Sequence, residues 1–354
     1  MPRHLEDTLI GSIYGSRNID KILIEKAGIY MEISYFDGKN VIKDNPAITR
    51  DPKTVFHYTS PNNFMSIFKD NKLWFSDCQF MNDKSEYVYI KKVFLKSTKS
   101  TNLELKIEKD KHFIDYLLPP YNTIRIERQK KGLIVKNWIK IKRYYLLCTS
   151  LKRDSHSLWC YYSKNNHYQG YNFGINTEKF INSMRGILPN EGCKITYGKV
   201  IYDEEEQVRQ IKDEIIRLSN EYDIDSTGKG NTSDESWIDS FQDDLADFIS
   251  DRCMFFKNPA FKHEDEFRFI IEAPYKKSDF ADEKSKDFFN FHIGPSGLIV
   301  PHLEIPFAKE AISGVTISPM MEQETARQGV ENFFICNNDI ENIEVQFSKI
   351  DLRY

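Results

Sequence analysis

The chain has 354 residues, a formal net charge of −4, 40% hydrophobic and 29% charged residues. This composition is ordinary for a globular protein and excludes a disordered or fibrous chain. No apolar run approaches the ~18 residues of a membrane-spanning helix, and the first residues do not form the apolar stretch of a secretory leader. We therefore expect a cytoplasmic protein without membrane contact. The six cysteines contain no Cys-x-x-Cys pair, so we expect no disulfide framework and no metal site.

Residues 1–50 are predicted as an N-terminal extension, with one strand at 29–36 and a turn at Asp37-Gly38. The remainder, 51–354, is predicted as one domain. Its strands are expected in short β-branched and aromatic runs, at residues 55–60, 73–76, 144–149, 170–175, 255–272, 296–300, 312–318 and 341–348. Helices are expected where polar and apolar residues follow a helical period, at residues 61–69, 103–145, 157–162, 203–222 and 234–252.

Two of the helical segments carry opposite charge. Within the basic helical segment 100–145, residues 125–143 hold a single acid, Glu127, against eight basic residues: Arg125, Arg128, Lys130, Lys131, Lys136, Lys140, Lys142 and Arg143. Such a stretch can contact nucleic-acid phosphates, but a solvated helix face is the simpler alternative. Pairing with an acidic segment of the same molecule is a third. The acidic helical insert 203–252 is such a segment, since residues 203–251 hold sixteen acidic residues against four basic ones.

The most informative stretch is 262–271, which reads KHEDEFRFII. As a strand it sends Glu264, Glu266 and Arg268 to one face, and Phe267 and Phe269 to the other. Carboxylates held on a rigid strand can stabilise a cationic transition state. The alternative is an exposed strand face that carries a cross-strand ion pair.

Two aromatic and histidine-bearing segments are further candidates. His57 lies on a predicted strand with Tyr58 and Thr59, where it can bind a ligand hydroxyl or be satisfied by backbone. Trp159 and Tyr162 share one face of a short helix, where either ring can stack on a planar ligand or pack in the core.

Taken together, these segments resemble a widespread bacterial family of intracellular proteins placed in the ADP-ribosyltransferase superfamily. The resemblance covers about residues 54–354, and its pieces occur in family order: His57-Tyr58-Thr59, Leu73–Ser76 leading to Asn82-Asp83, Leu147-Cys148-Thr149-Ser150, Trp159, Tyr162, Gly170, Glu264-x-Glu266-Phe267-Arg268 and Phe347–Tyr354. Lys84 departs from the family's usual Pro, and Ser318 stands where Gly is usual.

The resemblance implies an α+β fold, with a split, mostly antiparallel β-sheet core of ADP-ribosyltransferase type and helical insertions. It also implies NAD as a substrate. Glu266 would stabilise the oxocarbenium-like state at the nicotinamide ribose, and Glu264 would orient the acceptor or act as its base. Arg268 would keep both carboxylates ionised or meet the pyrophosphate. The residues expected to bind NAD are His57, Tyr58, Thr59, Asn82, Ser150, Trp159, Tyr162 and Arg268.

By this resemblance we expect an enzyme that transfers ADP-ribose to a macromolecular acceptor. Its biological role would be that of a bacterial toxin or antiphage defence effector, which a protein partner could neutralise. The acceptor would be a protein or a nucleic acid, either RNA or DNA, held by Arg125, Arg128, Lys130, Lys131, Lys140, Lys142 and Arg143. Two alternatives are an NAD glycohydrolase and a catalytically silent module that binds a nucleotide or a partner.

Overall fold

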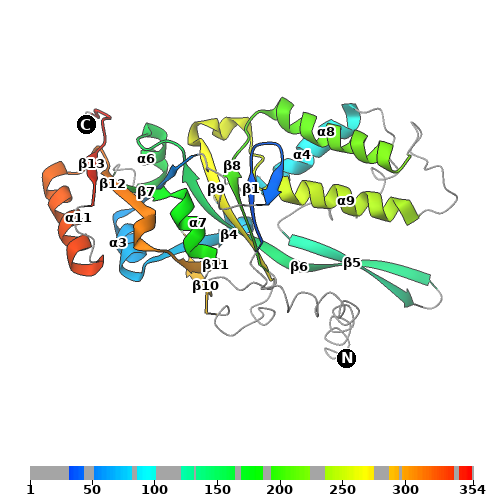
Figure 1. Ribbon diagram of the computed structural model, residues 1–354, viewed down its shortest axis with the longest axis horizontal. Coiled ribbons are helices and arrows are strands. Elements are labelled where there is room, and N and C mark those ends of the chain that lie inside the picture. Colours follow the sequence, from blue (N-terminus) through cyan, green and yellow to red (C-terminus); the bar gives the residue numbers. More distant parts are fainter. Residues whose placement is uncertain are drawn as a thin grey trace.

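The computed structural model describes residues 32–43, 52–81, 86–100, 121–130, 133–163, 169–185, 193–223, 236–274, 287–294, 297–338 and 343–352. One large mixed sheet runs through the molecule (Figure 1), and its main path has the order β13-β12-β7-β3-β6-β9-β8-β1-β2. The strands are β1 Glu32–Phe36, β2 Val41–Lys43, β3 Thr54–Thr59, β4 Lys72–Asp77, β5 Tyr121–Lys130, β6 Leu133–Ser150, β7 Tyr171–Asn176, β8 Lys194–Lys199, β9 Glu266–Pro274, β10 Phe289–Ile293, β11 Ile299–Pro306, β12 Ile312–Ile317 and β13 Val345–Phe347.

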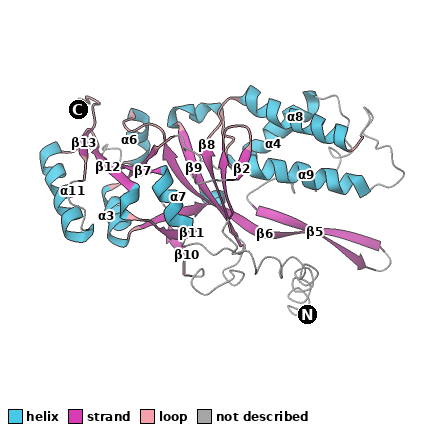
Figure 2. Cartoon of the chain, viewed as in Figure 1, coloured by secondary structure: helices cyan, strands magenta, loops and turns pink. Residues whose placement is uncertain are grey.

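Helices cover both faces of this sheet (Figure 2). They are α3 Pro61–Asp70, α4 Glu86–Ser100, α6 His156–Tyr162, α7 Thr177–Arg185, α8 Glu204–Glu221, α9 Ser236–Cys253 and α11 Gln323–Asn338, with short 3₁₀ turns η1 Cys78–Phe80, η3 Pro259–Glu264 and η5 Lys309–Ala311. On one face, α3, α7 and α11 bury a core with members such as Phe68, Phe180 and Phe334. On the other face, α4, α8 and α9 bury a second core that includes Ile215 and Phe241.

The sheet is mostly antiparallel, because β1–β8 and β12–β13 are the parallel pairs between its described strands. It also splits along one edge of β6. There β3 pairs with β6 at Phe56 and Ser150, whereas β4 pairs further along, where Ser76 lies opposite Leu146. The predicted α+β class is therefore confirmed, and the large sheet is mixed but mostly antiparallel, while the ADP-ribosyltransferase type remains an expectation.

The alternation predicted around Glu266 is confirmed for β9. Phe267, Phe269 and Ile271 enter the first core, whereas Ile270 enters the second. The strand begins at Glu266, because Asp265 takes a left-handed conformation (φ 46°, ψ 56°) and ends the turn η3 before it. The alternative of an exposed strand face is wrong, since Glu266 and Arg268 are buried and Arg268 donates to the carbonyl of Met254, which follows α9.

The predicted N-terminal extension is part of the sheet where it is described. β1 pairs in parallel with β8, and Phe36 is fully buried and stacks on Phe255 at a centroid distance of 4.6 Å. The turn predicted at Asp37-Gly38 is confirmed, because the Asp37 carboxylate accepts hydrogen bonds from the backbone of Lys39 and Asn40. Gly38 supplies the positive φ of 100° that this turn requires.

The basic helix predicted across 100–145 is wrong over its second half, which forms the antiparallel hairpin β5–β6. The reason is visible in the sequence: Ile124, Ile126, Ile139 and Ile141 alternate with polar residues, and β-branched residues at a period of two favour a strand. In Figure 1 the hairpin extends away from the sheet centre, at the opposite end of the molecule from α11.

The two helices predicted in the acidic insert are confirmed as α8 and α9. None of the described helices is long and apolar enough to cross a membrane. Within the described residues, no group of three or more histidine, cysteine or acidic side chains is arranged to hold a metal ion.

Candidate functional site

A small cavity of about 40 Å³ lies on the sheet where β3 and β6 separate. Five elements from three separate stretches of the chain contribute to its wall. The lining residues are Phe56, His57, Tyr58, Cys148, Thr149, Ser150, Leu158, Tyr162, Glu264 and Glu266. The structure thus brings His57 of β3, Tyr162 of α6, Glu264 of η3 and Glu266 of β9 to one place.

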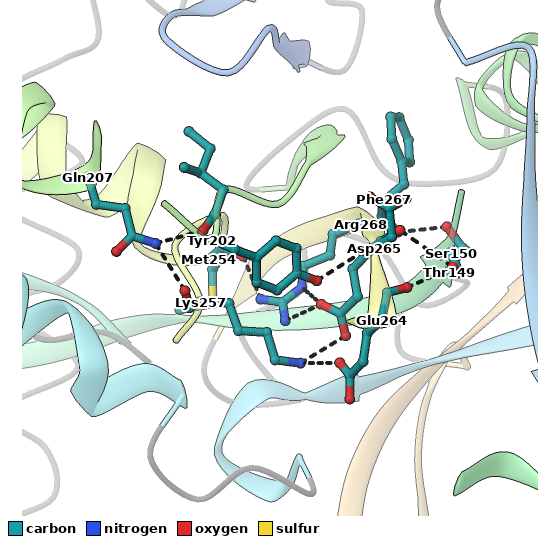
Figure 3. Close-up of polar contacts among 12 residues, drawn as sticks. Thr149, Ser150, Tyr202, Gln207, Met254, Lys257, Glu264, Asp265, Phe267 and Arg268 are labelled. Carbon is teal, nitrogen blue, oxygen red and sulfur yellow. Dashed lines mark hydrogen bonds and ion pairs between the residues drawn. The ribbon is translucent and has the colours of Figure 1, made fainter. Parts of the chain in front are cut away.

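The two glutamates share one lysine (Figure 3). The ammonium of Lys257 donates to Glu264 Oε2 at 2.7 Å and to Glu266 Oε1 at 2.9 Å. The side chains of the three residues are at most 10% exposed. Because Lys257 follows α9 and faces the start of β9, it ties the helical layer to the sheet at this point.

Arg268 holds the second oxygen of Glu266. Its Nε and Nη2 lie 2.8 and 2.5 Å from Glu266 Oε2, and Nη1 donates to the carbonyl of Met254 at 2.6 Å. Arg268 is fully buried and does not line the cavity. Arg268 therefore pairs with Glu266 and, from this position, does not meet a pyrophosphate in the cavity.

The backbone around this cluster is fixed from the side of β8 and α8. The amide of Glu266 donates to the hydroxyl of Tyr202 at 3.0 Å. Gln207 donates to the carbonyls of Ile201 at 2.6 Å and Lys257 at 3.0 Å. Both glutamates and their lysine are therefore held in place by main-chain anchors that Figure 3 draws as dashed lines.

Burial dominates the titration of the central carboxyl. It raises the pKa of Glu266 to about 8, helped by the neighbouring Glu264 and opposed by the ammonium of Lys257. Burial works against the charged form of Lys257 too, but Glu266 and Glu264 outweigh it and raise the pKa of the ammonium above its ordinary value. Lys257 is therefore charged at every physiological pH, whereas Glu266 titrates near neutrality.

The other polar groups on the wall are neutral. Burial lowers the pKa of His57, against a hydrogen bond from its Nδ1–H to the carbonyl of Cys148 at 3.1 Å. The neutral ring then presents Nε2 as an acceptor. Burial, and after it the carboxylates of Glu264 and Glu266, raise the pKa of Tyr162, so its hydroxyl remains a donor.

Several residues expected to bind NAD have hydrogen-bond partners or buried positions within the fold, and Tyr58 and Ser150 among them also line the cavity. Tyr58 donates to the carbonyl of Lys152 at 2.8 Å, and Trp159 donates to Asp154 at 2.7 Å and is 1% exposed. Ser150 lines the cavity, but its hydroxyl donates to the carbonyl of Glu264 at 2.7 Å. Thr59 is buried and does not line the cavity. Asn82 lies outside the described residues.

Lys257 and Tyr202 are the members of the site that the sequence did not indicate. Lys257 follows the apolar run Met254-Phe255-Phe256, and a lysine in such a place is a weak sign of a buried cation. Nothing in the sequence connects it with Glu264 and Glu266, because their contact depends on how α9 ends against β9.

Comparison with known proteins gives one match. Residues 158–269 match a family described as "Protein of unknown function (DUF2971)". The matched segment includes Tyr162, Glu264 and Glu266. It does not include His57, which lies about 100 residues before its first residue. No curated protein and no solved structure matched this chain.

Proposed function

We propose that this protein cleaves NAD at the nicotinamide–ribose bond and transfers ADP-ribose to a macromolecular acceptor. The observation that supports the proposal is the meeting of His57, Tyr162 and Glu266 on one cavity from three separate elements. The family resemblance implies a histidine, a ring and a carboxylate on separate strands; here His57 and Glu266 lie on strands, whereas Tyr162 lies on the helix α6.

The chemistry of the donors suits this reaction. Loss of nicotinamide generates positive charge on the ribose, and a carboxylate beside the sugar stabilises that charge. Glu266 takes this role in the proposal, and Lys257 with Arg268 holds its carboxylate in one orientation. Because Glu266 must be ionised to act, the rate of nicotinamide release should rise as pH increases through about 8.

The volume of the site sets a condition on the proposal. Sites for small molecules usually enclose at least about 300 Å³, whereas this cavity has about 40 Å³. The side chains are suitable for NAD, but the closed cavity does not hold its nicotinamide end. Binding therefore requires α6 and η3 to separate from β3, and no step is assigned to NAD within the closed form.

The closed cavity also favours a second candidate function. Both carboxylates are paired with cations, as expected of a fold that keeps its charge cluster for stability and binds a nucleotide or partner without turnover. An NAD glycohydrolase is the third candidate, in which water replaces the acceptor at the same cavity.

The geometry of the cavity does not indicate the acceptor or the biological role, which rest on the family resemblance. A nucleic acid held by the basic residues of the β5–β6 hairpin, and a role as a toxin or defence effector, remain predictions. Charge reversal at Lys130, Lys131, Lys140 and Lys142 should abolish salt-sensitive nucleic-acid binding if the hairpin is the contact surface.

Purified protein incubated with NAD distinguishes the candidates. Nicotinamide with labelled acceptor indicates transfer, nicotinamide with free ADP-ribose indicates hydrolysis, and no turnover indicates a silent module. Glu266→Gln should lower nicotinamide release about 10²–10³-fold, as loss of one electrostatic stabiliser does in other enzymes. Glu304→Gln removes a carboxylate distant from the cavity and should leave the rate unchanged. Equal rates for the wild type and Glu266→Gln would overturn the assignment.

A further inference from the structure

A larger groove, of about 560 Å³, lies on the other side of the segment that carries the two glutamates. His263 and Asp265 line this groove, whereas Glu264 and Glu266 line the cavity. Alternate residues of one short segment therefore face two different spaces. We call the larger space the lysine groove, after Lys152, Lys199 and Lys262 in its wall.

The groove has positive charge that its own acids do not neutralise. Asp265 pairs with Lys199 at 3.5 Å. The carboxylate of Asp203 caps α8, where it accepts from the backbone of Glu205 and Glu206. Lys262 is exposed, and Lys152 is exposed with its ammonium 3.3 Å from the backbone carbonyl of His263, which carries no net charge. The three lysines of the wall thus exceed its two acids by one, and Lys152 and Lys262 are exposed cations that can meet an anion.

An exposed aromatic ring lies beside these cations. Tyr161 of α6 is 62% exposed, and its ring centroid lies 5.5 Å from that of His263, at an interplanar angle of 47°. A ring this exposed offers a face on which a base can stack. Cations along a groove together with an exposed ring are typical of proteins that bind single-stranded nucleic acid.

We propose that the lysine groove and Tyr161 bind a single-stranded nucleic acid, with phosphates on Lys152 and Lys262 and a base stacked on Tyr161. The site differs from the basic hairpin. Lys142, at the inner end of the hairpin, is eight residues of β6 away from Ser150, a distance of roughly 27 Å along a strand. Strand binding at the groove stands by itself. The role of that strand as the ADP-ribose acceptor rests on the proposed function.

The experiment is a salt series of fluorescence anisotropy with a short labelled oligouridine and the full-length protein, without NAD. Lys152→Glu with Lys262→Glu should weaken binding at least tenfold and reduce the slope of log K against log salt by about 1.4, since each lost phosphate contact removes about 0.7 on a single strand. Tyr161→Ala should weaken binding about 5- to 150-fold, the effect of one lost stacking contact, with the salt slope unchanged. Lys69→Glu with Lys179→Glu changes the net charge equally on α3 and α7 and should bind like the wild type.

Two results would overturn the inference. One is a wild type that does not bind the oligouridine, or binds only duplex. The other is unaltered affinity in both the groove double variant and Tyr161→Ala. Nicotinamide release is measured in parallel without oligouridine. If the wild type binds oligouridine, the groove variants do not, and the wild type releases no nicotinamide, the groove is supported and the proposed enzyme is refuted. The two failures are therefore distinguishable.

Discussion

At the scale of single residues, the decisive feature is a buried set of four ionisable side chains. Lys257 and Arg268 face Glu264 and Glu266, so the set is neutral in sum when all four are ionised. Removing charges from water costs several kcal/mol for each ion, and only close pairing compensates for that loss. The cluster therefore stabilises the fold only while it is complete.

Removal of Lys257 should show this dependence. Lys257→Met leaves two buried carboxylates with a single cation and should lower the free energy of unfolding by about 3–5 kcal/mol, measured by urea denaturation. Lys72→Met is the matched control, because Lys72 pairs with Glu304 near the surface and such a pair contributes about 0–1 kcal/mol. Equal losses in the two variants would show that the buried cluster has no special weight.

The raised pKa of Glu266 predicts how stability changes with pH. The folded value of about 8 lies above the ordinary 4.5, so the folded protein binds one proton more than the unfolded chain between these values. Stability from this group is complete below about pH 4.5 and is lost as pH rises through about 8, with a slope of at most about 1.4 kcal/mol per pH unit. Lys257 titrates above this window and does not alter it.

Glu266→Gln should remove that slope, and urea denaturation at several pH values measures it. Glu304→Gln is a control of opposite sign. Although burial opposes it, hydrogen bonds from Lys72 and Asn290 hold the pKa of Glu304 below its ordinary value. Its contribution should be lost only as pH falls below about 4.5. A wild type and a Glu266→Gln variant with parallel curves from pH 5 to pH 8 would contradict the assigned pKa.

The residue scale also shows what the sequence could indicate. His57, Tyr162 and Glu266 were found from alternation, helical spacing and family order, and the fold brings them together. The burial of Glu266 could not be predicted, because it depends on the loop after α9 that carries Lys257. Tyr58 and Trp159 were indistinguishable from ligand-binding rings, since their hydrogen bonds to Lys152 and Asp154 depend on loops with no periodic signal.

At the scale of elements, local chemistry determined some boundaries and long-range pairing determined others. α3 begins at Pro61 because the side chain of Ser60 accepts a hydrogen bond from the amide of Asn63. A serine followed by a proline signals a helix start in the sequence. The β5–β6 hairpin was misassigned because charged residues are common in helices and obscured its period of two. The start of β9 could not be located, since it depends on the left-handed Asp265.

Gly198 provides a test of how closely β1 and β8 approach. A Cβ atom at this position would lie 2.5 Å from the carbonyl oxygen and 2.8 Å from the Cβ of Phe36. Gly198→Ala should therefore force the strands apart and destabilise the protein by about 1–3 kcal/mol in thermal or urea unfolding. Gly329→Ala on α11 meets no atom within 4 Å and should stabilise the protein by about 0.5–1 kcal/mol, because alanine favours a helix. Stabilisation by both substitutions would mean that β1 is not packed against β8.

At the scale of the whole molecule, the split beside β6 determines where a ligand can enter. β3 belongs to the half of the sheet that continues through β7, whereas Glu266 belongs to the half that continues through β8. The sequence predicted neither this strand order nor the place of β1, because both depend on pairings between residues more than 90 positions apart. The cavity lies between the two halves, so opening it requires movement of the covering elements rather than of one side chain.

This arrangement predicts where bound NAD should slow hydrogen exchange. The amides of β3 and of η3 with the start of β9 are distant in sequence but border the same cavity, so NAD should protect both segments together. The β5–β6 hairpin, at the far end of β6, serves as an internal reference and should exchange at an unchanged rate. Glu266→Gln should bind NAD and give the same paired protection, because the substitution removes charge and not volume. Protection of η3 without β3 would place the ligand outside the split, and the enzymatic role of Glu266 with His57 would then be untenable.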